Sequence, residues 1–432
     1  MSFRCSMVLV LMVVMAAAGK RNTLATEWRQ FRGPTGQGHS DATGVPTRWS
    51  PTSGIGWQVE VPGKGWSSPV VSKGRIYLTT AKPVGEETIA SAKKFSLRVE
   101  TPYELQVHCL DAGSGQTLWQ TSVGEVPARV SIHPKNSHAS GTPIVDGDRI
   151  YVHFGIYATA ALDLDGNVIW KRAIQFKPVH GCGGSPVLYK DRLIFHCDGG
   201  DQAFVIALDA ATGEQRWRRE RSVDAKRKFS FATPLVIETE TGPTLVSPAS
   251  DAVYGYDPRT GNEKWFVRYP EKWSIVPRPV FAGGLILVCT GYEGNPELLA
   301  IRPGGSGDVS ESHVAWRTSR FVPYNPSPVV VDDRVFNVSD DGIASCLDLS
   351  NGELIWKQRL GGNYSASPFV AEGKIYFLSE EGECTVIRAS DQFEEIASNA
   401  IEERTLASMV PVEKGVLLRT ATKLYHIDGE SL

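Results

Sequence analysis

The stretch Ala207-Leu-Asp-Ala-Ala-Thr-Gly-Glu-Gln-Arg-Trp217 decides the fold of this chain, because complete or altered copies of it return along the sequence. In a full copy an aspartate opens a turn, a glycine follows and a tryptophan closes the segment. The tryptophans that recur in this way are Trp119, Trp170, Trp217, Trp265, Trp316 and Trp356. A regular internal period indicates one supersecondary unit that is copied and stacked.

Each repeat also carries a Ser-Pro, Thr-Pro or Arg-Pro pair followed by apolar residues. The prolines of these pairs are Pro69, Pro143, Pro186, Pro234, Pro279, Pro328 and Pro368. Short runs of β-branched and aromatic residues between Gly, Asp and Asn turns predict four antiparallel strands per repeat. Four strands in roughly 40 to 50 residues is the size of a propeller blade.

The two ends of the chain each carry an incomplete repeat. The last copy begins at Ala407-Ser-Met-Val410 and lacks a fourth strand, whereas Ile55-Gly-Trp57-Gln-Val-Glu-Val61 has a tryptophan but no three strands before it. Pairing the N-terminal strand with the last three strands leaves no open sheet edge. We therefore predict an all-β fold, an eight-bladed β-propeller of four-stranded antiparallel blades over residues 55–432. A seven-bladed ring is the alternative if the last copy is not a blade.

The conserved spacing within the repeat is explained by structure rather than by ligand binding. An aspartate side chain accepts backbone N–H bonds in a tight turn, and glycine takes the left-handed backbone position. Metal binding by these aspartates is the less favoured interpretation. The tryptophans are predicted to pack between neighbouring sheets, and this structural set is Trp57, Trp119, Trp170, Trp217, Trp265, Trp316 and Trp356.

Composition and the N-terminus indicate an exported protein. The net charge is -3 without a basic stripe, which argues against nucleic acid as a partner. The apolar run Met7–Ala18 has signal-peptide length and is too short for a membrane span. We predict a signal peptide over residues 1–25, an N-terminal extension over residues 26–54, and a periplasmic or envelope location without a membrane span after cleavage. An uncleaved anchor is the alternative.

The seven cysteines show no metal-type spacing. Cys182 and Cys197 flank a hairpin that turns near residues 189–191, and counting out from the turn places them nearly opposite each other. A disulfide between them is therefore one prediction, and a pair of buried free thiols is the other.

The pattern Ala-x-Asp-x-x-Thr-Gly-x-x-x-Trp resembles the repeat of the PQQ-type eight-bladed propellers. That superfamily includes quinoprotein alcohol dehydrogenases and, more distantly, BamB-type outer-membrane assembly proteins. The chain is most similar to exported PQQ-binding-like β-propeller proteins of the planctomycete type. The stretches that carry this similarity are Trp28-Arg-Gln-Phe-Arg-Gly-Pro34, His133-Pro-Lys-Asn-Ser-His138, Ala300-Ile-Arg-Pro-Gly304, Tyr324-Asn-Pro-Ser-Pro328 and Tyr364-Ser-Ala-Ser-Pro368.

The resemblance implies the fold more strongly than any reaction, because one fold hosts many activities. The dehydrogenases use a disulfide between neighbouring cysteines, a calcium ion held by Glu, Asn and Asp, and a catalytic Asp. None of these features can be placed in this sequence. The lipobox cysteine of BamB-type proteins is also absent.

A ligand site is expected on the face where loops lead into the first, innermost strand of each blade. The polar and aromatic residues of these loops suit a small polar or anionic ligand, with Lys228 and Arg278 as its charge partners. The candidate set is Trp66, His138, His180, Lys228, Arg278, Asn325 and Tyr364.

Two further features fall on the same face. His138, His180 and Cys182 could supply zinc or copper ligands, although hydrogen bonds from the histidines to loop backbone are the favoured interpretation. The first blade carries a mixed-charge excursion, Lys82–Tyr103, which is either a recognition loop or a tolerated insertion. A smaller excursion, Gly291–Pro296, joins this face.

We therefore predict a non-catalytic exported binding or scaffold protein that presents rim loops to an envelope protein, a polysaccharide or a small polar ligand, with no cofactor. One alternative is a dehydrogenase that depends on PQQ and calcium. The other alternative is a BamB-like factor for outer-membrane protein assembly.

Overall fold

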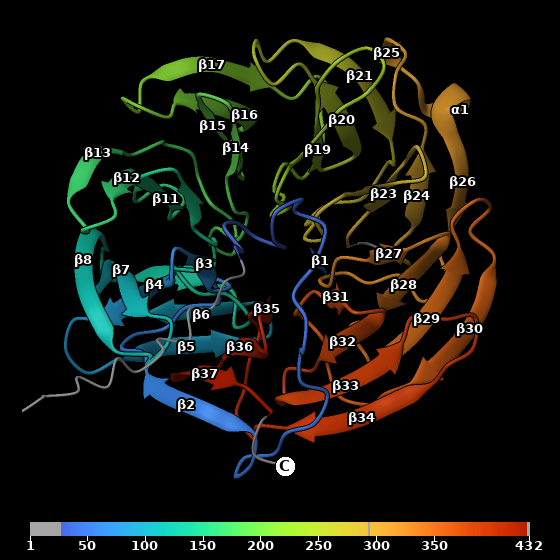
Figure 1. Ribbon diagram of the computed structural model, residues 1–432. Helices are drawn as coiled ribbons and strands as arrows, with labels where there is room; N and C mark the ends of the chain where they lie inside the picture. Colours follow the sequence, from blue (N-terminus) through green and yellow to red (C-terminus); the bar gives the residue numbers. More distant parts are fainter. Residues whose placement is uncertain (1–26, 293, 430–432) are drawn as a thin grey trace, which may run out of the picture.

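The protein is a ring of small antiparallel sheets. The computed structural model describes residues 27–292 and 294–429, so the predicted signal peptide lies outside the described residues. Within them the chain forms eight blades of four antiparallel strands, two of which carry a fifth, parallel strand, and the blades surround a common axis (Figure 1). The prediction of an all-β, eight-bladed propeller is confirmed. No helix in the described part of the chain is long and apolar enough to span a membrane.

Seven of the blades follow the chain in order, each starting at the axis and ending at the rim. Blades 1 to 3 contain β3 (Val70–Ser72), β4 (Arg75–Pro83), β7 (Tyr103–Asp111), β8 (Thr117–Val126); β10 (Ile144–Asp146), β11 (Arg149–His153), β12 (Thr159–Asp163), β13 (Val168–Arg172); β14 (Val187–Tyr189), β15 (Arg192–Asp198), β16 (Ala203–Asp209) and β17 (Gln215–Glu220).

Blades 4 to 7 repeat this arrangement on the other side of the ring. They contain β18 (Leu235–Ile237), β19 (Thr244–Ala249), β20 (Ala252–Tyr256), β21 (Glu263–Arg268); β22 (Val280–Ala282), β23 (Leu285–Cys289), β24 (Leu298–Ile301), β26 (Val314–Thr318); β27 (Val329–Val331), β28 (Arg334–Val338), β29 (Ile343–Asp348), β30 (Leu354–Arg359); β31 (Phe369–Ala371), β32 (Lys374–Leu378), β33 (Glu383–Arg388) and β34 (Glu395–Ala400).

The eighth blade combines the two ends of the chain. Its inner three strands are β35 (Val410–Val412), β36 (Gly415–Arg419) and β37 (Lys423–Ile427), and its outer strand is β2 (Ile55–Glu60). β2 runs antiparallel to β37, with Val59 opposite Leu424. This is the strand pairing that the sequence predicts for the orphan segment around Trp57.

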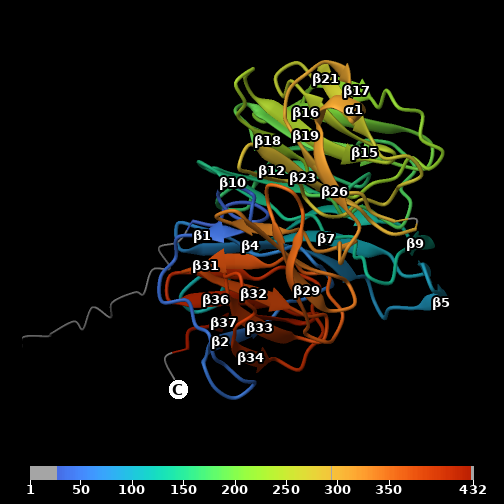
Figure 2. The same ribbon diagram turned by 90° about the vertical axis from the view of Figure 1, so that its right-hand side faces the viewer.

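Short additional elements decorate the ring. β1 (His39–Ser40) lies parallel to β31 at the axis, and β25 (Gly307–Asp308), followed by α1 (Ser310–His313), extends the outer edge of blade 4. The excursion in blade 1 forms β5 (Ile89–Lys93) and β6 (Ser96–Val99), and β6 pairs with both β5 and β9 (Val130–Ile132). Figure 2 shows this small sheet on the face opposite β1.

The repeat motif joins neighbouring blades. A Cβ atom added to Gly213 would lie 2.5 Å from Trp170, so the indole ring of blade 2 rests directly on the glycine of blade 3. The Trp170 Nε1–H also donates to the Ala210 carbonyl, at 3.0 Å, in the same turn. Equivalent ring-on-glycine contacts join Trp57 to Gly115, Trp119 to Gly166, Trp217 to Gly261 and Trp316 to Gly352.

The alanine of the motif makes room for the tryptophan of its own blade. Ala207 stands directly opposite Trp217 across β16 and β17, and the ladder shifts register immediately afterwards. A small residue occupies this place in the other blades that follow the pattern, namely Cys109, Ala161, Gly255, Ala300 and Cys346. Two of the unexplained cysteines are therefore small apolar core residues.

A segment before β1, residues 28–38, crosses the end of the central channel, and we call it the plug. Trp28 exchanges backbone hydrogen bonds with Val71 of blade 1. The Gly38 carbonyl accepts from the Val370 N–H of blade 7 at 2.8 Å. The plug therefore ties together inner strands that lie on different sides of the ring, and it lies over the middle of the ring in Figure 1.

The contact between Trp170 and Gly213 predicts that a methyl group added at position 213 lowers the stability of the protein strongly. Gly213→Ala combines a left-handed backbone (φ +71) with a collision, so we expect it to lower the free energy of unfolding by about 2–5 kcal/mol. Gly147→Ala is the matched control, because Gly147 also has positive φ (+60) but no atom within 4 Å. It should cost only about 1–2 kcal/mol. Urea unfolding measures both, and equal losses would contradict the proposed contact.

Candidate functional site

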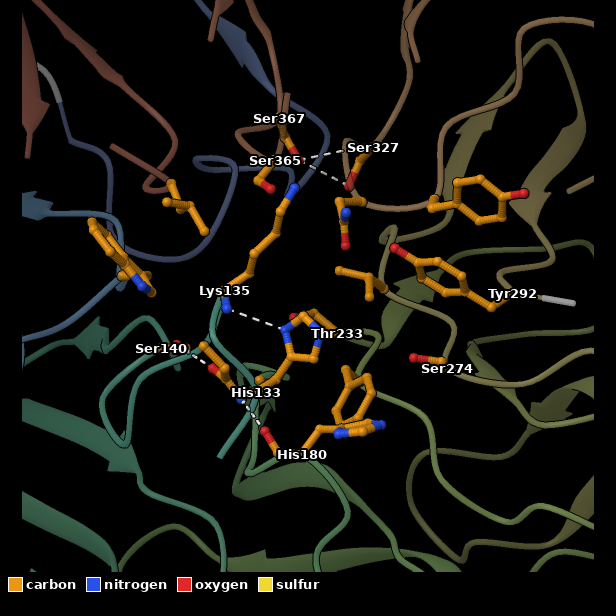
Figure 3. Close-up of a pocket in the computed structure, with 18 of the residues that line it drawn as sticks. His133, Lys135, Ser140, His180, Thr233, Ser274, Tyr292, Ser327, Ser365 and Ser367 are labelled. Carbon is orange, nitrogen blue, oxygen red and sulfur yellow. Dashed lines mark hydrogen bonds between the residues drawn. The ribbon is translucent and has the colours of Figure 1, made fainter. Parts of the chain in front are cut away.

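A cavity of about 890 Å³ lies on the axis of the ring. It extends from Phe31, in the plug, to Lys94 and Phe95, at the tip of the β5–β6 hairpin. Because the plug and the hairpin lie on opposite faces (Figure 2), this axial cavity runs along the channel and is blocked by the plug at one end. The loops that lead into the inner strands form its walls (Figure 3).

A ring of hydroxyl groups surrounds the cavity just before the inner strands begin. Seven blades place a Ser or Thr here, and we call this set the hydroxyl ring: Ser68, Thr142, Ser185, Thr233, Ser327, Ser367 and Ser408. The backbone N–H of one member donates to the side-chain oxygen of the next, as from Ser68 to Thr142 (3.0 Å) and from Thr142 to Ser185 (2.9 Å). The Ser/Thr-Pro pairs of the sequence therefore link adjacent blades at the axis.

Arg278 occupies the eighth position of this ring. Its backbone N–H still donates to Ser327 Oγ at 2.9 Å, but its guanidinium turns toward the plug and donates to the Phe31 carbonyl at 2.6 Å. Arg32, from the plug, donates to the Pro328 carbonyl at 2.7 Å. Burial lowers the pKa of both arginines to about 9, so both stay charged at neutral pH. Neither pairs with a carboxylate in the described part of the chain.

Aromatic side chains form a continuous wall above the hydroxyl ring. Phe95 stacks on His133, His133 meets His180 edge-on with centroids 5.3 Å apart, and His180 meets Phe229 in the same way at 5.6 Å. On the opposite side Tyr292 and Tyr324 stack with centroids 4.3 Å apart. Such surfaces pack against flat rings and sugar faces.

The charges at the mouth are positive. Lys94, Arg227 and Arg404 line the cavity, and none of the three forms an ion pair with a described residue. The guanidinium of Arg227 lies 4.0 Å from the centre of the Trp273 ring, which holds it over the aromatic wall. None of the described lining residues is an Asp or a Glu. All three charges therefore attract an anion.

Lys135 is a cation whose charge is already matched. It extends through the cavity (Figure 3), and its Nζ lies 2.7 Å from Glu380 Oε1, which is contributed by blade 7. Ser365 Oγ donates to the same carboxylate oxygen at 2.6 Å. The buried Glu380 thus holds Lys135 away from a ligand.

The histidines of the wall are neutral at physiological pH. Burial, followed by the charges of its neighbours His180 and Lys135, lowers the pKa of His133. Burial also lowers the pKa of His180. His133 Nδ1 accepts the Lys135 backbone N–H at 3.1 Å, so its ring orientation is fixed by its own loop. Both rings act as aromatic surface rather than as charges.

Three of the seven residues predicted from the sequence line the cavity: Trp66, His180 and Asn325. The other four do not. His138 packs between Tyr103 and Tyr157, and Tyr364 is buried in the core of blades 6 and 7. Lys228 turns to Asp224 outside the cavity, and Arg278 points into the plug.

Of the two states predicted for Cys182 and Cys197, the structure has the free thiols and not the disulfide. β14 begins only at Val187, which pairs with Ile194, and this register would bring residue 184 level with Cys197. Cys182 Sγ instead packs closely on Gly155 of blade 2. Burial raises the pKa of Cys182 to about 12, so its thiol stays protonated.

Sequence reasoning missed most of the aromatic and cationic lining. The excursion Lys82–Tyr103 had two interpretations, and the structure brings its tip, Lys94 and Phe95, to the cavity. The stretch His133–His138 carries part of the family resemblance, and in it His133 and Lys135 line the cavity whereas His138 does not. Aromatic residues next to basic ones, as in Arg227-Lys-Phe229, were the available signal.

A calcium-bound quinone would need several oxygen ligands for the metal, carboxylates above all. The described lining contains no such carboxylates. No group of three or more His, Cys, Asp or Glu is gathered anywhere in residues 27–292 and 294–429. The donor set present in these residues does not fit this cofactor, and the proposed trio of His138, His180 and Cys182 is not brought together.

Comparisons with known proteins agree with the fold. The family profile described as outer membrane protein assembly factor BamB matches residues 104–316 and 308–430. BamB from Moraxella catarrhalis has a TM-score of 0.52 at 15% identity, over 85% of this chain and 97% of that chain. A europium-containing methanol dehydrogenase has a TM-score of 0.50 at 13% identity, over 93% and 98%. These likenesses show the fold alone. No curated protein sequence matches.

Asp340 beneath the cavity wall predicts a pH effect on stability. It accepts the backbone N–H of Tyr324 at 2.7 Å, yet burial raises its pKa from 3.8 to about 6. The protonated Asp340 carboxyl therefore contributes fully to the free energy of unfolding below about pH 4. This contribution, about 3 kcal/mol, is lost as pH rises through about 6. Urea unfolding between pH 4 and 7 should show this loss relative to Asp340→Asn. Parallel profiles for the two proteins would disprove it.

Proposed function

The chain belongs to the family described as outer membrane protein assembly factor BamB, and we propose that it acts as an exported, non-catalytic binding protein. Its ligand in this proposal is a small anion that carries a ring and enters the axial cavity. The observation that carries the proposal is the lining, in which aromatic rings and three unpaired cations surround about 890 Å³ without a described carboxylate.

Size and chemistry of the cavity support this ligand class. Small-molecule sites are concave, largely apolar and of roughly 300–1,000 Å³, with a few convergent polar groups. Here Tyr292 and Tyr324 on one side and His180 and Phe229 on the other offer flat faces for a ring. Lys94, Arg227 and Arg404 at the mouth attract negative charge and speed its approach.

The arrangement of the polar groups supports binding rather than catalysis. General acid–base or nucleophilic catalysis needs a base within hydrogen-bond reach of the group it activates. In the described structure neither His133 nor His180 hydrogen-bonds a side-chain hydroxyl, thiol or carboxylate. Ser140 Oγ donates instead to the Asn136 amide oxygen at 2.6 Å, which is a structural contact within one loop.

Export rests on the sequence of the leader, which lies outside the described residues. The alternative of a quinone-dependent dehydrogenase lacks support from the donor set of the cavity. A partner protein, as the family description suggests, is compatible with the exposed Val84, Ile89 and Phe95 of the blade 1 excursion. The cavity is the more specific feature, and the proposal rests on it.

Phenyl phosphate is a suitable test ligand, because it combines a ring with an oxyanion, and benzyl alcohol is its neutral counterpart. We expect calorimetry to detect binding of phenyl phosphate and much weaker binding of benzyl alcohol. The double variant Arg227→Gln/Arg404→Gln should weaken phenyl phosphate binding about tenfold, since it removes two charge-assisted contacts.

Arg302→Gln is the control, since Arg302 is exposed and does not line the cavity. It should leave the affinity unchanged. Equal affinity of the double variant and the wild type, or preference for the neutral compound, would refute an anion site.

Removal of the Glu380 carboxylate, which forms an ion pair with Lys135, should strengthen the binding of phenyl phosphate. Glu380→Gln keeps an acceptor for Ser365 but frees the Lys135 charge, so we expect phenyl phosphate affinity to rise about three- to tenfold. Glu381→Gln is the matched control, because its carboxylate bonds Asn363 and not Lys135. A titration of both variants by calorimetry decides, and a rise in neither would show that Lys135 does not reach the ligand.

A further inference from the structure

The hydroxyl ring has hydrogen atoms to donate. Thr142, Ser185 and Thr233 each accept a backbone N–H from the preceding blade. A hydroxyl that accepts in this way still has its own O–H to donate. No described residue accepts that proton from any of the three. Only Ser367 uses its O–H within the ring, by donating to Ser327 Oγ at 3.1 Å.

Ser68 carries a hydroxyl group that the contacts of the repeat leave without a partner. Ser68 is one of the residues that line the cavity, it is only 2% exposed, and its buried Oγ has no hydrogen-bond partner in the described chain. A buried hydroxyl without a partner costs about 1–3 kcal/mol, so such groups call for an explanation. A bound acceptor in the axial cavity supplies one.

The charge around the ring favours an acceptor that is negative. Arg278 occupies the eighth ring position, and Arg32 approaches from the plug without a carboxylate partner in the described chain. Arg32 also has two buried nitrogens, Nε and one Nη, without any hydrogen-bond partner. Burial of uncompensated cations is unfavourable, and an anion nearby would offset part of that cost.

We infer that the hydroxyl ring is an oxyanion subsite, which holds the terminal phosphate, sulfate or carboxylate group of the ligand. This inference rests on the proposed function and adds an orientation to it. The ligand enters with its oxyanion toward Phe31 and the plug, and its ring remains at the level of the aromatic wall. Lys94, Arg227 and Arg404 stay at the mouth and contact the outer part of the molecule.

The donor arrangement also distinguishes between oxyanions. Thr142, Ser185 and Thr233 stand on three consecutive blades and offer three donors side by side. A tetrahedral group has three free oxygens for them, whereas a planar carboxylate has only two. Phosphate and sulfate should therefore bind more tightly than acetate. Hydroxyl donors are neutral, so the subsite does not depend on the protonation of a histidine.

Ser68→Ala is the decisive variant, because it removes an O–H donor without breaking a hydrogen bond of the unliganded protein. Calorimetry on the full chain uses inorganic phosphate, sulfate, acetate and phenyl phosphate at constant ionic strength. We expect Ser68→Ala to weaken phosphate and phenyl phosphate binding about tenfold or more. The melting temperature without ligand should stay the same or rise.

Two further variants keep the test independent of folding defects. Thr142→Val removes a donor but also the acceptor of the Ser68 N–H, and Thr142→Ser restores both, so affinity should fall and then recover. Ser306→Ala is the control, since Ser306 is exposed and does not line the cavity, so its loss should leave affinity unchanged.

The outcomes separate this inference from the proposed function. Binding of phenyl phosphate that depends on Arg227 and Arg404 but not on Ser68 or Thr142 would overturn the oxyanion subsite and leave the anion site standing. Binding of phenyl phosphate without measurable binding of inorganic phosphate or sulfate would also overturn it. Absence of binding of all four compounds at millimolar concentration would overturn both proposals.

Discussion

The contact on which the structure depends is the indole ring of one blade lying on the glycine of the next. It has two components, a ring face against a position without a Cβ atom and an indole N–H bonded to a carbonyl of the same turn, as between Trp170 and Gly213. Both components are directional, so they fix the angle between sheets as well as their distance. The indole-on-glycine contact recurs at five of the eight junctions between blades, and a common angle between sheets leaves a channel along the axis.

The channel inherits its chemistry from the same repetition. Six of the seven hydroxyl oxygens of the ring accept the backbone N–H from the same position in the neighbouring blade, which explains why Ser or Thr stands there. A structural requirement thus lines the channel with hydroxyl groups that have O–H protons to spare. Three features of the cavity do not repeat from blade to blade. They are Arg278 in the ring, the plug at one end of the channel and the Lys94–Phe95 hairpin tip at the other.

The sequence was a good guide where a residue type has one structural role. Blade number, the β2–β37 pairing around Trp57 and the packing tryptophans follow from fixed spacing and from bulky side chains that must be buried. The site was predicted only in part, because neighbouring loop residues differ in which one faces the lumen. His180, at φ +63, lines the cavity, whereas His138 turns into the wall. The disulfide alternative for Cys182 and Cys197 was excluded only by the hairpin register, which brings residue 184 rather than Cys182 level with Cys197. The place of Lys94 and Phe95 in the cavity lining could not be predicted, because it depends on the pairing of their hairpin with β9. Local sequence patterns do not show such a contact between distant segments.

The plug has a consequence for how the molecule is made. It leaves the ribosome early, yet its bonding partners include Val370 and Pro328, and β2 needs β37. Most of the chain must be synthesised before these first segments can reach their final positions, and contacts so distant in sequence slow the search for the native state. The plug and β2 are therefore the last segments to settle. Until then the nascent protein keeps an unpaired sheet edge at each end, and it is in this interval that it most needs protection from aggregation.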